Sequence, residues 1–365
     1  MTADLHRGRK SLFFFAWSIT TIIFSAPALL SASNAFQISS FAVRSTPASG
    51  RLRNLLGHAS AVDGTVEFRE ADREFSLLLP NQTPLTMDSS TPFWETLQKD
   101  GVVRVDGAIS HASGEALRNH IDDMLEESIG DVATFKVPRA FRFANVLEKA
   151  CRWDLLLPFD DKIEEDGNGG SSDPIMTALD ELLGEEGSIA PIIEETLGPD
   201  AILYELACLI SDPESLRQEI HPDIVYSADS LPIVACFVSL QDVDDTMGPT
   251  VFLPGTATEF HHAAINGDPE ATDAMLSSTP SVSNTLGLGD ASLYNPMVLH
   301  AGGGNFSHRR RRLFYCTFLD PTKIDPSSDF NPGSIRPDLK MRNLSFGEIK
   351  GALGEWRKQC SAAAT

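Results

Sequence analysis

The sequence has no closely spaced pair of cysteines. Its five cysteines lie at positions 151, 208, 236, 316 and 360, so neither a disulfide framework nor a zinc ribbon is indicated. Three of them, Cys208, Cys236 and Cys316, lie inside apolar runs of strand-like composition. We expect these three to be buried as small hydrophobic side chains.

Acidic residues are also absent from one long stretch of the chain, between Asp4 and Asp63. Residues 1–62 carry six bases and one acid, a charge of +5, and subtracting this from the formal net charge of -22 leaves -27 for residues 63–365. A charge of that size repels phosphate backbones and disfavours a general nucleic-acid-binding surface. We therefore expect no nucleic-acid partner.

The acid-free leader has the composition of two targeting segments. Residues 7–10 contain three bases, residues 11–30 are mostly apolar and small residues follow, which is typical of a secretory signal peptide over residues 1–35. The alternative is a membrane anchor, because the run approaches the ~20 residues that cross a bilayer. Pro27 and the interspersed Ser and Thr favour cleavage. Residues 36–62 are rich in Ser and Arg, like a transit peptide.

The two segments in series, with Phe36 at their junction, resemble the bipartite presequence of algae with complex plastids. The resemblance implies a location in a complex plastid, and the secretory pathway is the alternative. No run after residue 36 is apolar enough to span a membrane, so we expect no stable membrane span in the mature form. Residues 63–90 are expected to be a linker, and the oligomeric state stays open.

The rest of the chain changes character at about residue 198. Helical spacing of apolar residues dominates from 91 to 198. From 200 to 320, short runs rich in β-branched and aromatic residues alternate with Pro, Gly, Asp and Ser clusters, and no helical period is visible. This pattern predicts a β-sandwich or a jelly-roll barrel behind a helical part. Residues 346–365 are expected to form a C-terminal helix and tail.

Two of the nine histidines begin a His-x-Asp sequence. His120 and Asp122 lie in a predicted helix, where positions i and i+2 point about 200° apart, so their side chains cannot share a metal ion. We expect them on the helix surface. His221 and Asp223 flank Pro222 in a segment predicted to be extended, where positions i and i+2 share one face about 6.5 Å apart. They are therefore a candidate pair of metal ligands.

His300 is the candidate third ligand. It ends an apolar run and precedes Ala301 and three glycines, which leave room for a bound molecule. Two imidazoles and one carboxylate on one face of an octahedron are typical of non-haem Fe(II) oxygenases, because three positions stay open for co-substrate and O₂. His261 and His262 show no such pattern, and we expect them at the surface.

Beyond His300 the sequence resembles the phytanoyl-CoA dioxygenase-like family of Fe(II)/2-oxoglutarate-dependent oxygenases. The family shows His-x-Asp, an Asn/Met-Gly-Pro loop with a Pro-Gly turn, and a distal His with Asn at +5, Ser at +7 and Arg at +11. The matching positions are His221, Asp223, Met247-Gly248-Pro249, Pro254-Gly255, His300, Asn305, Ser307 and Arg311. The resemblance covers about residues 93–319. It implies one dioxygenase domain over residues 91–345, mainly β with flanking helices, with a double-stranded β-helix (a jelly roll or cupin-like barrel) as its core.

The resemblance also implies roles for single residues. His221, Asp223 and His300 are the implied catalytic metal ligands. Arg311 is the implied partner of the distal carboxylate of 2-oxoglutarate, because a planar guanidinium binds a carboxylate through two hydrogen bonds. Alternation along a strand places Arg311 on the opposite face from Arg310 and Arg312, which are expected at the rim or surface.

One position departs from the family pattern. Many members carry Ser two residues after the distal His, where it helps to hold the co-substrate, and this sequence has Gly302 there. Ser307 and Tyr204 are the candidates to replace that contact.

The implied cofactors are Fe(II), 2-oxoglutarate and O₂, and the implied reaction is hydroxylation of an unactivated C–H bond in a small-molecule or lipid-derived substrate, with release of succinate and CO₂. A carboxylate at Asp223 implies hydroxylation rather than halogenation. Two alternatives remain: a non-catalytic jelly-roll protein that binds a metal or ligand, and a barrel metalloenzyme that does not use 2-oxoglutarate. Substrate contacts are expected from the helical part, the loop 160–172 and the segment 256–285.

Overall fold

The structure, a computed structural model, describes residues 83–86, 92–147, 149–160, 173–226, 231–325 and 333–363. The predicted signal peptide and transit-peptide-like segment, most of the linker and most of the loop 160–172 lie outside these residues. Within the described part of the chain, no helix is both long and apolar enough to cross a membrane.

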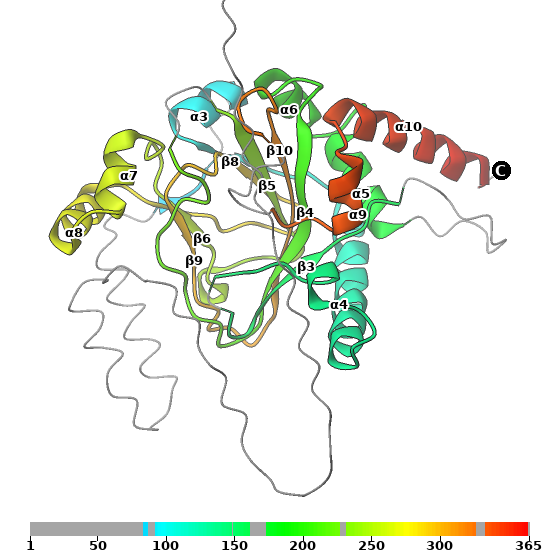
Figure 1. Cartoon of the computed structure of the whole chain (residues 1–365), viewed down its shortest axis with the longest axis horizontal. Coiled ribbons are helices and arrows are strands. Elements are labelled where there is room, and N and C mark those ends of the chain that lie inside the picture. The colour runs from blue at the N-terminus through cyan, green and yellow to red at the C-terminus, as the bar shows by residue number, and fades with distance from the viewer. Residues whose placement is uncertain are drawn as a thin grey trace, which may run out of the picture. The chain divides into compact units, whose positions relative to one another are not determined.

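Two β-sheets form the core of the domain (Figure 1). The major sheet has the strand order β2 (Val102–Val105), β8 (Ala291–Tyr294), β5 (Ile233–Ser239), β10 (Arg311–Leu319), β4 (Ile202–Ser211) and β3 (Arg152–Leu156). The minor sheet has the order β1 (Thr83–Pro84), β7 (Val282–Ser283), β6 (Thr250–Phe252) and β9 (His300–Gly302). Every neighbouring pair is antiparallel except β1 with β7. The predicted jelly-roll fold is confirmed.

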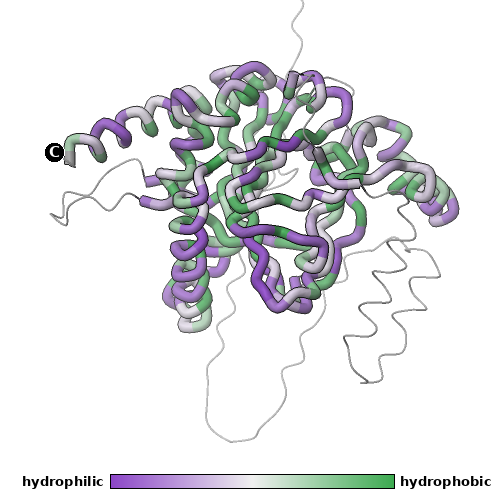
Figure 2. Tube along the Cα trace, turned by 180° about the vertical axis from the view of Figure 1, so that it is seen from behind, coloured by the Kyte–Doolittle hydropathy of each residue, from purple (hydrophilic) through white to green (hydrophobic). Residues whose placement is uncertain are grey.

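The central strands of the major sheet are buried on both faces. Along β10, Phe314, Cys316 and Phe318 pack with the helices on the outer face, whereas Leu313 and Tyr315 belong to a separate inner cluster. A strand that is buried on both faces shows a continuous apolar run rather than alternation. Figure 2 shows this as green strands at the centre and purple outer turns of the helices. Cys208, Cys236 and Cys316 are buried and free, as expected.

Six helices pack beside the outer face of the major sheet or at its ends: α3 (Phe93–Lys99), α4 (His111–Ala133), α5 (Pro174–Leu183), α6 (Ala190–Thr196), α9 (Pro337–Arg342) and α10 (Phe346–Ala363). Capping residues fix where two of these helices begin. The Ser110 hydroxyl caps α4, and Asp173 caps α5 just before Pro174 at the first helical position. The predicted C-terminal helix is present and packs against α5 through an apolar face that includes Leu353 and Trp356.

Each half of the chain contains elements that sequence analysis did not identify. The strand β3 lies in the part expected to be mostly helical, where it pairs with β4 at the edge of the major sheet. In the part expected to lack helices, α7 (Glu259–Ile265) and α8 (Pro269–Ser278) occur. With seven and ten residues, they are too short for a period to show, but their caps, Thr258 and Asp268, are typical helix starts.

Candidate metal centre

Backbone pairing brings the predicted metal ligands together. The amide of His221 donates to the carbonyl of His300 at 2.9 Å, and the amide of His300 donates to the carbonyl of His221 at 3.0 Å. The amide of Asp223 donates to the carbonyl of Pro296 at 2.8 Å. Two segments almost eighty residues apart are thus held side by side, with all three side chains directed to one point.

The three side chains have the spacing of a metal site. One ligand atom from each of His221, Asp223 and His300 can be chosen so that all lie within 4.8 Å of one another. The Nε2 atom of His300 is 3.4 Å from Oδ2 of Asp223, and the Nε2 atom of His221 is 3.7 Å from Oδ1. These separations leave space for one ion between the three groups.

Second contacts orient both imidazole rings. Nδ1 of His221 is 2.7 Å from the carbonyl of Glu219, and Nδ1 of His300 is 2.9 Å from the carbonyl of Val298. A carbonyl only accepts hydrogen bonds, so each Nδ1 carries the proton and each Nε2 presents its lone pair. This is the tautomer that a metal-binding histidine needs.

The electrostatics of the site favour an ionised carboxylate. Burial alone would raise the pKa of Asp223, but His300, His221 and a hydrogen bond from the Tyr294 hydroxyl at 3.1 Å hold it below its usual value. Burial lowers the pKa of His221, helped by the neighbouring His300. At His300, burial would lower the pKa, but the charge and hydrogen bond of Asp223 and the Val298 carbonyl outweigh it and raise the pKa. The carboxylate is therefore anionic, and a metal ion would displace the proton that Asp223 favours on His300.

The three ligands line a cavity of about 490 Å³ between the inner faces of the two sheets. Its wall includes Thr250 and Gly302 from the minor sheet, and Phe237 and Tyr315 from the major sheet. Residues 145–147 and Lys149 also contribute, in line with contacts from the helical part. None of the lining residues belongs to the segment 256–285, and contacts of this segment with the substrate stay a prediction.

Arg311 lies beside this cavity, fully buried at 1% exposure. Its Nη2 donates to the Ser211 hydroxyl at 3.1 Å, while its Nε has no hydrogen-bond partner among the described residues. Burial, and then the charge of Arg152, lower the pKa of Arg311 to about 9. Arg152 donates to the same hydroxyl at 3.1 Å. Because a buried guanidinium beside another positive charge is unfavourable without a counter-charge, this position is suited to binding an anion.

Gly302 leaves a space that another side chain fills. A Cβ atom at Gly302 would lie 2.7 Å from Oε1 of Gln218 and 3.5 Å from Nη2 of Arg311. The Gln218 Oε1 accepts a hydrogen bond from the Gly302 amide at 2.9 Å. Gln218 lies in an irregular segment with no recognisable pattern, and sequence analysis missed it. Its side chain stands where the serine of other family members would point.

The structure does not place Ser307 and Tyr204 at this position. The Ser307 hydroxyl bonds to Oδ1 of Asn305 and the carbonyl of Arg309, within the turn before β10, and Ser307 does not line the cavity. Tyr204 does line it, but lies seven residues along β4 from Ser211, roughly 20 Å away in an extended strand. A contact between Tyr204 and the co-substrate stays a prediction.

His262 was expected at the surface and is instead buried. Its Nε2 is 2.7 Å from the carbonyl of Met297, and its Nδ1 accepts from the amide of Tyr226 at 3.1 Å. His262 thus connects Tyr226, which follows Asp223, to Met297, which precedes His300. The two segments are far apart in sequence. No local pattern could reveal this contact.

Arg310, directly before β10, and Arg312 within it point to the outer face of the sheet, as the alternation predicted. Arg312 binds both carboxylate oxygens of Asp122 on α4, at 2.8 and 2.7 Å. Arg310 reaches the same Asp122 at 3.2 Å and also pairs with Asp212. Asp122, which was expected on the helix surface beside His120, therefore links α4 to β10 through ion pairs.

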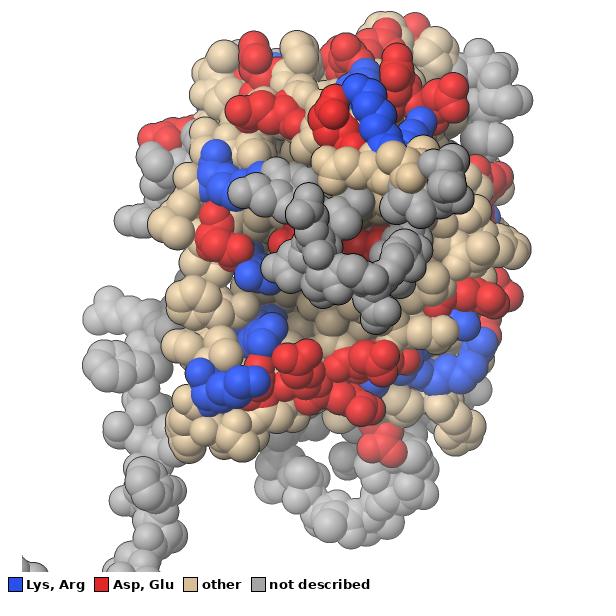
Figure 3. All heavy atoms as spheres, turned by 90° about the vertical axis from the view of Figure 1, so that its right-hand side faces the viewer, with Lys and Arg blue, Asp and Glu red and all other residues tan. Residues whose placement is uncertain are grey.

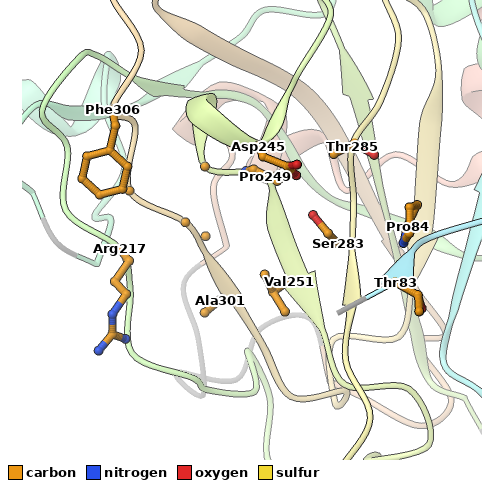
Figure 4. A pocket seen from close by; sticks show the side chains of 14 residues that line it. Thr83, Pro84, Arg217, Asp245, Pro249, Val251, Ser283, Thr285, Ala301 and Phe306 are labelled. Atoms are coloured by element: carbon orange, nitrogen blue, oxygen red, sulfur yellow. The ribbon is translucent and has the colours of Figure 1, made fainter. Parts of the chain in front are cut away.

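A second cavity, of about 350 Å³, lies on the opposite face of the minor sheet (Figure 4). Val251 and Ala301 line it, whereas their neighbours Thr250 and His300 point to the first cavity. Its charged lining residues are Arg217 and Asp245, and it contains no histidine. The first cavity, which the three candidate metal ligands line, is therefore the candidate active site.

Solved structures similar to this chain include SnoK, described as a non-heme alpha ketoglutarate dependent carbocyclase from nogalamycin biosynthesis, at 16% identity, with 73% of this chain and 95% of that chain covered and a TM-score of 0.46. The epimerase SnoN, in complex with Fe3+, alpha ketoglutarate and nogalamycin RO, is 18% identical, with 63% and 82% covered and a TM-score of 0.42. AviO1 from Streptomyces viridochromogenes Tue57 is 16% identical, with 65% and 96% covered and a TM-score of 0.44.

No curated protein matches the chain in a sequence search. The sequence model of one family, described as phytanoyl-CoA dioxygenase (PhyH), matches residues 97–313, which is more than half of the chain. This range contains all three candidate metal ligands and Arg311. The chain therefore belongs to the phytanoyl-CoA dioxygenase family of Fe(II)/2-oxoglutarate-dependent oxygenases.

Proposed function

We propose that this protein hydroxylates a C–H bond of a small-molecule substrate, using Fe(II), 2-oxoglutarate and O₂. The observation that carries the proposal is the set of His221, Asp223 and His300, which present two imidazole Nε2 atoms and a carboxylate to one cavity. Three ligands on one side leave the other coordination positions open. A carboxylate as third ligand supports hydroxylation.

The residues present fit the implied cofactors. The donor set suits Fe(II), and the buried Arg311, with an Nε that lacks a partner, suits a carboxylate. Bound Fe(II) would supply the oxidation, in which substrate C–H, O₂ and 2-oxoglutarate give the alcohol, succinate and CO₂. The chain itself orients the two rings through their Nδ1 contacts and holds Asp223 through Tyr294.

We assign the co-substrate contact of the missing serine to Gln218. Its side chain is mostly buried, and no hydrogen bond from its Nε2 occurs among the described residues. It lines the catalytic cavity and lies next to Arg311 across Gly302. An amide donor there would take the place of a hydroxyl in holding an oxygen of 2-oxoglutarate.

Substitutions of Gln218 and Gly302, made singly and together, test the assignment. Gln218→Ala is expected to weaken 2-oxoglutarate binding about tenfold, since a hydrogen bond to a charged group contributes roughly 1.5 kcal/mol. Gly302→Ser alone should also weaken it, because the new Cβ meets Gln218 Oε1 at 2.7 Å. The double variant should recover most of the affinity, because the hydroxyl enters the vacated space. Titration calorimetry with Mn(II) in place of Fe(II) measures this without turnover, and simple addition of the two losses would contradict it.

Succinate formation separates the three candidate functions. Purified protein with Fe(II), 2-oxoglutarate and O₂ is incubated with a metabolite collection, and succinate is measured with and without each compound. An oxygenase gives iron-dependent succinate that rises with one substrate class. A non-catalytic binding protein gives none although it binds 2-oxoglutarate, and a metalloenzyme of another kind does not bind 2-oxoglutarate. Either of the last two results would overturn the proposal.

A further inference from the structure

The catalytic cavity has a second charged wall, which the proposed reaction does not use. Asp154 on β3 and Glu205 on β4 both line the cavity. The Tyr315 hydroxyl is 2.9 and 3.0 Å from the two oxygens of Asp154, and the Ser334 hydroxyl donates to Oδ2 at 2.6 Å. Thr317 donates to Glu205 at 2.6 Å, and the Ser334 amide donates to it at 3.1 Å. We call Asp154 and Glu205 the acidic wall.

The charge of the acidic wall is not compensated within the described chain. No described lysine, arginine or histidine forms an ion pair with Asp154 or Glu205. Burial raises the pKa of Asp154 to about 6 and that of Glu205 to about 7, where repulsion by Asp223 and Asp154 adds to the effect. The base that lines the same cavity, Lys149, is exposed and bonds to Asn145. A buried carboxylate, Asp154, beside a half-buried one, Glu205, is costly without a cation, because each loses hydration.

The acidic wall lies apart from the binding site for the co-substrate. Glu205 is opposite Thr317 in the ladder, whereas Ser211, the partner of Arg311, is opposite Arg311 itself. Six residues along the strand correspond to roughly 20 Å. A shift in register at this point also places Tyr204 in the cavity lining beside Glu205. A dicarboxylate held by Arg311 thus leaves the acidic wall accessible to a second molecule.

We propose that the acidic wall is the recognition site for a cationic group of the substrate, so that the substrate is an amine with an apolar body. The proposal rests on the proposed function. An ammonium group supplies the missing positive charge and donates up to three hydrogen bonds to the free lone pairs of the two carboxylates. Leu209, Ile233 and Phe237 in the same cavity provide apolar surface for the body of the molecule. The acidic wall also repels a second molecule of 2-oxoglutarate from the substrate's place.

Acidic groups are also plentiful outside the cavity. Figure 3 shows a face on which acidic and basic side chains are interspersed, and the formal net charge of the chain is -22. The resulting negative potential attracts cations toward the protein and increases their rate of association. This favours an amine over a carboxylic acid or a phosphate ester before contact is made.

Three small molecules of one shape test the proposal: cyclohexylmethylamine, cyclohexylmethanol and cyclohexanecarboxylate. Binding is measured on protein loaded with Mn(II) and 2-oxoglutarate, through the relaxation of probe protons by the paramagnetic ion, which also reports closeness to the metal centre. The amine is expected to bind at least tenfold more tightly than the alcohol, and the acid most weakly. Glu205→Gln and Asp154→Asn should each abolish the preference for the amine.

Controls separate this inference from the proposed function. Glu195→Gln on the surface of α6 removes the same charge without touching the cavity, and should keep the preference. The affinity for 2-oxoglutarate should be unchanged in Glu205→Gln, which shows that the variant is folded. If the amine binds no better than the alcohol, or not at all, while 2-oxoglutarate binds normally, the inference fails and the proposed function stands. If the wild type does not bind 2-oxoglutarate, both fail.

Discussion

His221→Ala is expected to abolish iron-dependent succinate formation and to weaken binding of the metal by at least about 100-fold, since even loss of a group behind a metal ligand costs 10- to 100-fold. The variant should still fold. His221 is paired with His300 through backbone atoms, which alanine keeps, and its side chain is 21% exposed. Metal content after dialysis and succinate release report the two effects separately.

His111→Ala is the matched control, because His111 is an exposed histidine at the start of α4, outside the cavity. It should retain wild-type metal content and activity. Unfolding temperatures of the two variants, measured without metal, should be similar. A His221→Ala protein that still binds iron and forms succinate would show that His221 is not a ligand.

Arg311→Ala is expected to cause the largest loss of 2-oxoglutarate affinity, about 100-fold or more, because a buried two-bond contact between guanidinium and carboxylate disappears. Arg152 stays buried behind it and does not replace it, since its hydrogen bonds go to Ser211 and the carbonyl of Leu216. Calorimetric titration of the Mn(II) protein with 2-oxoglutarate measures the change.

Arg310→Ala serves as the neighbouring control. Arg310 has the same side chain one residue away, but it pairs with Asp122 and Asp212 on the outer face of β10. We expect a loss of stability of about 1 kcal/mol and an unchanged affinity for 2-oxoglutarate. Equal losses of affinity in the two variants would refute the assignment of faces along β10.

Local patterns predicted three side chains that the structure brings together. The His-x-Asp pair could be assigned because an extended chain brings positions i and i+2 to one side, and the structure brings His300 to the same point. Alternation along β10 correctly separated Arg311 from its neighbours. In both cases the decisive geometry lies within a few residues of the chain, where the period of the backbone determines it.

The rest of the cavity could not be predicted in this way. Gln218, Arg152 and the acidic wall come from segments that share no local pattern and meet only through the pairing of β3, β4 and β10. Likewise, the strand β3 and the short helix α8 depend on contacts with distant parts of the domain. The roles of the first 62 residues stay a prediction.

The run of arginines that leads into β10 has a consequence for the charge around the cavity. Arg310 and Arg312 form ion pairs with Asp122 and Asp212 on the outer face of the sheet. These two carboxylates lie outside the cavity and neutralise the guanidiniums on either side of Arg311. The positive charge that this run directs inward is therefore that of the buried Arg311.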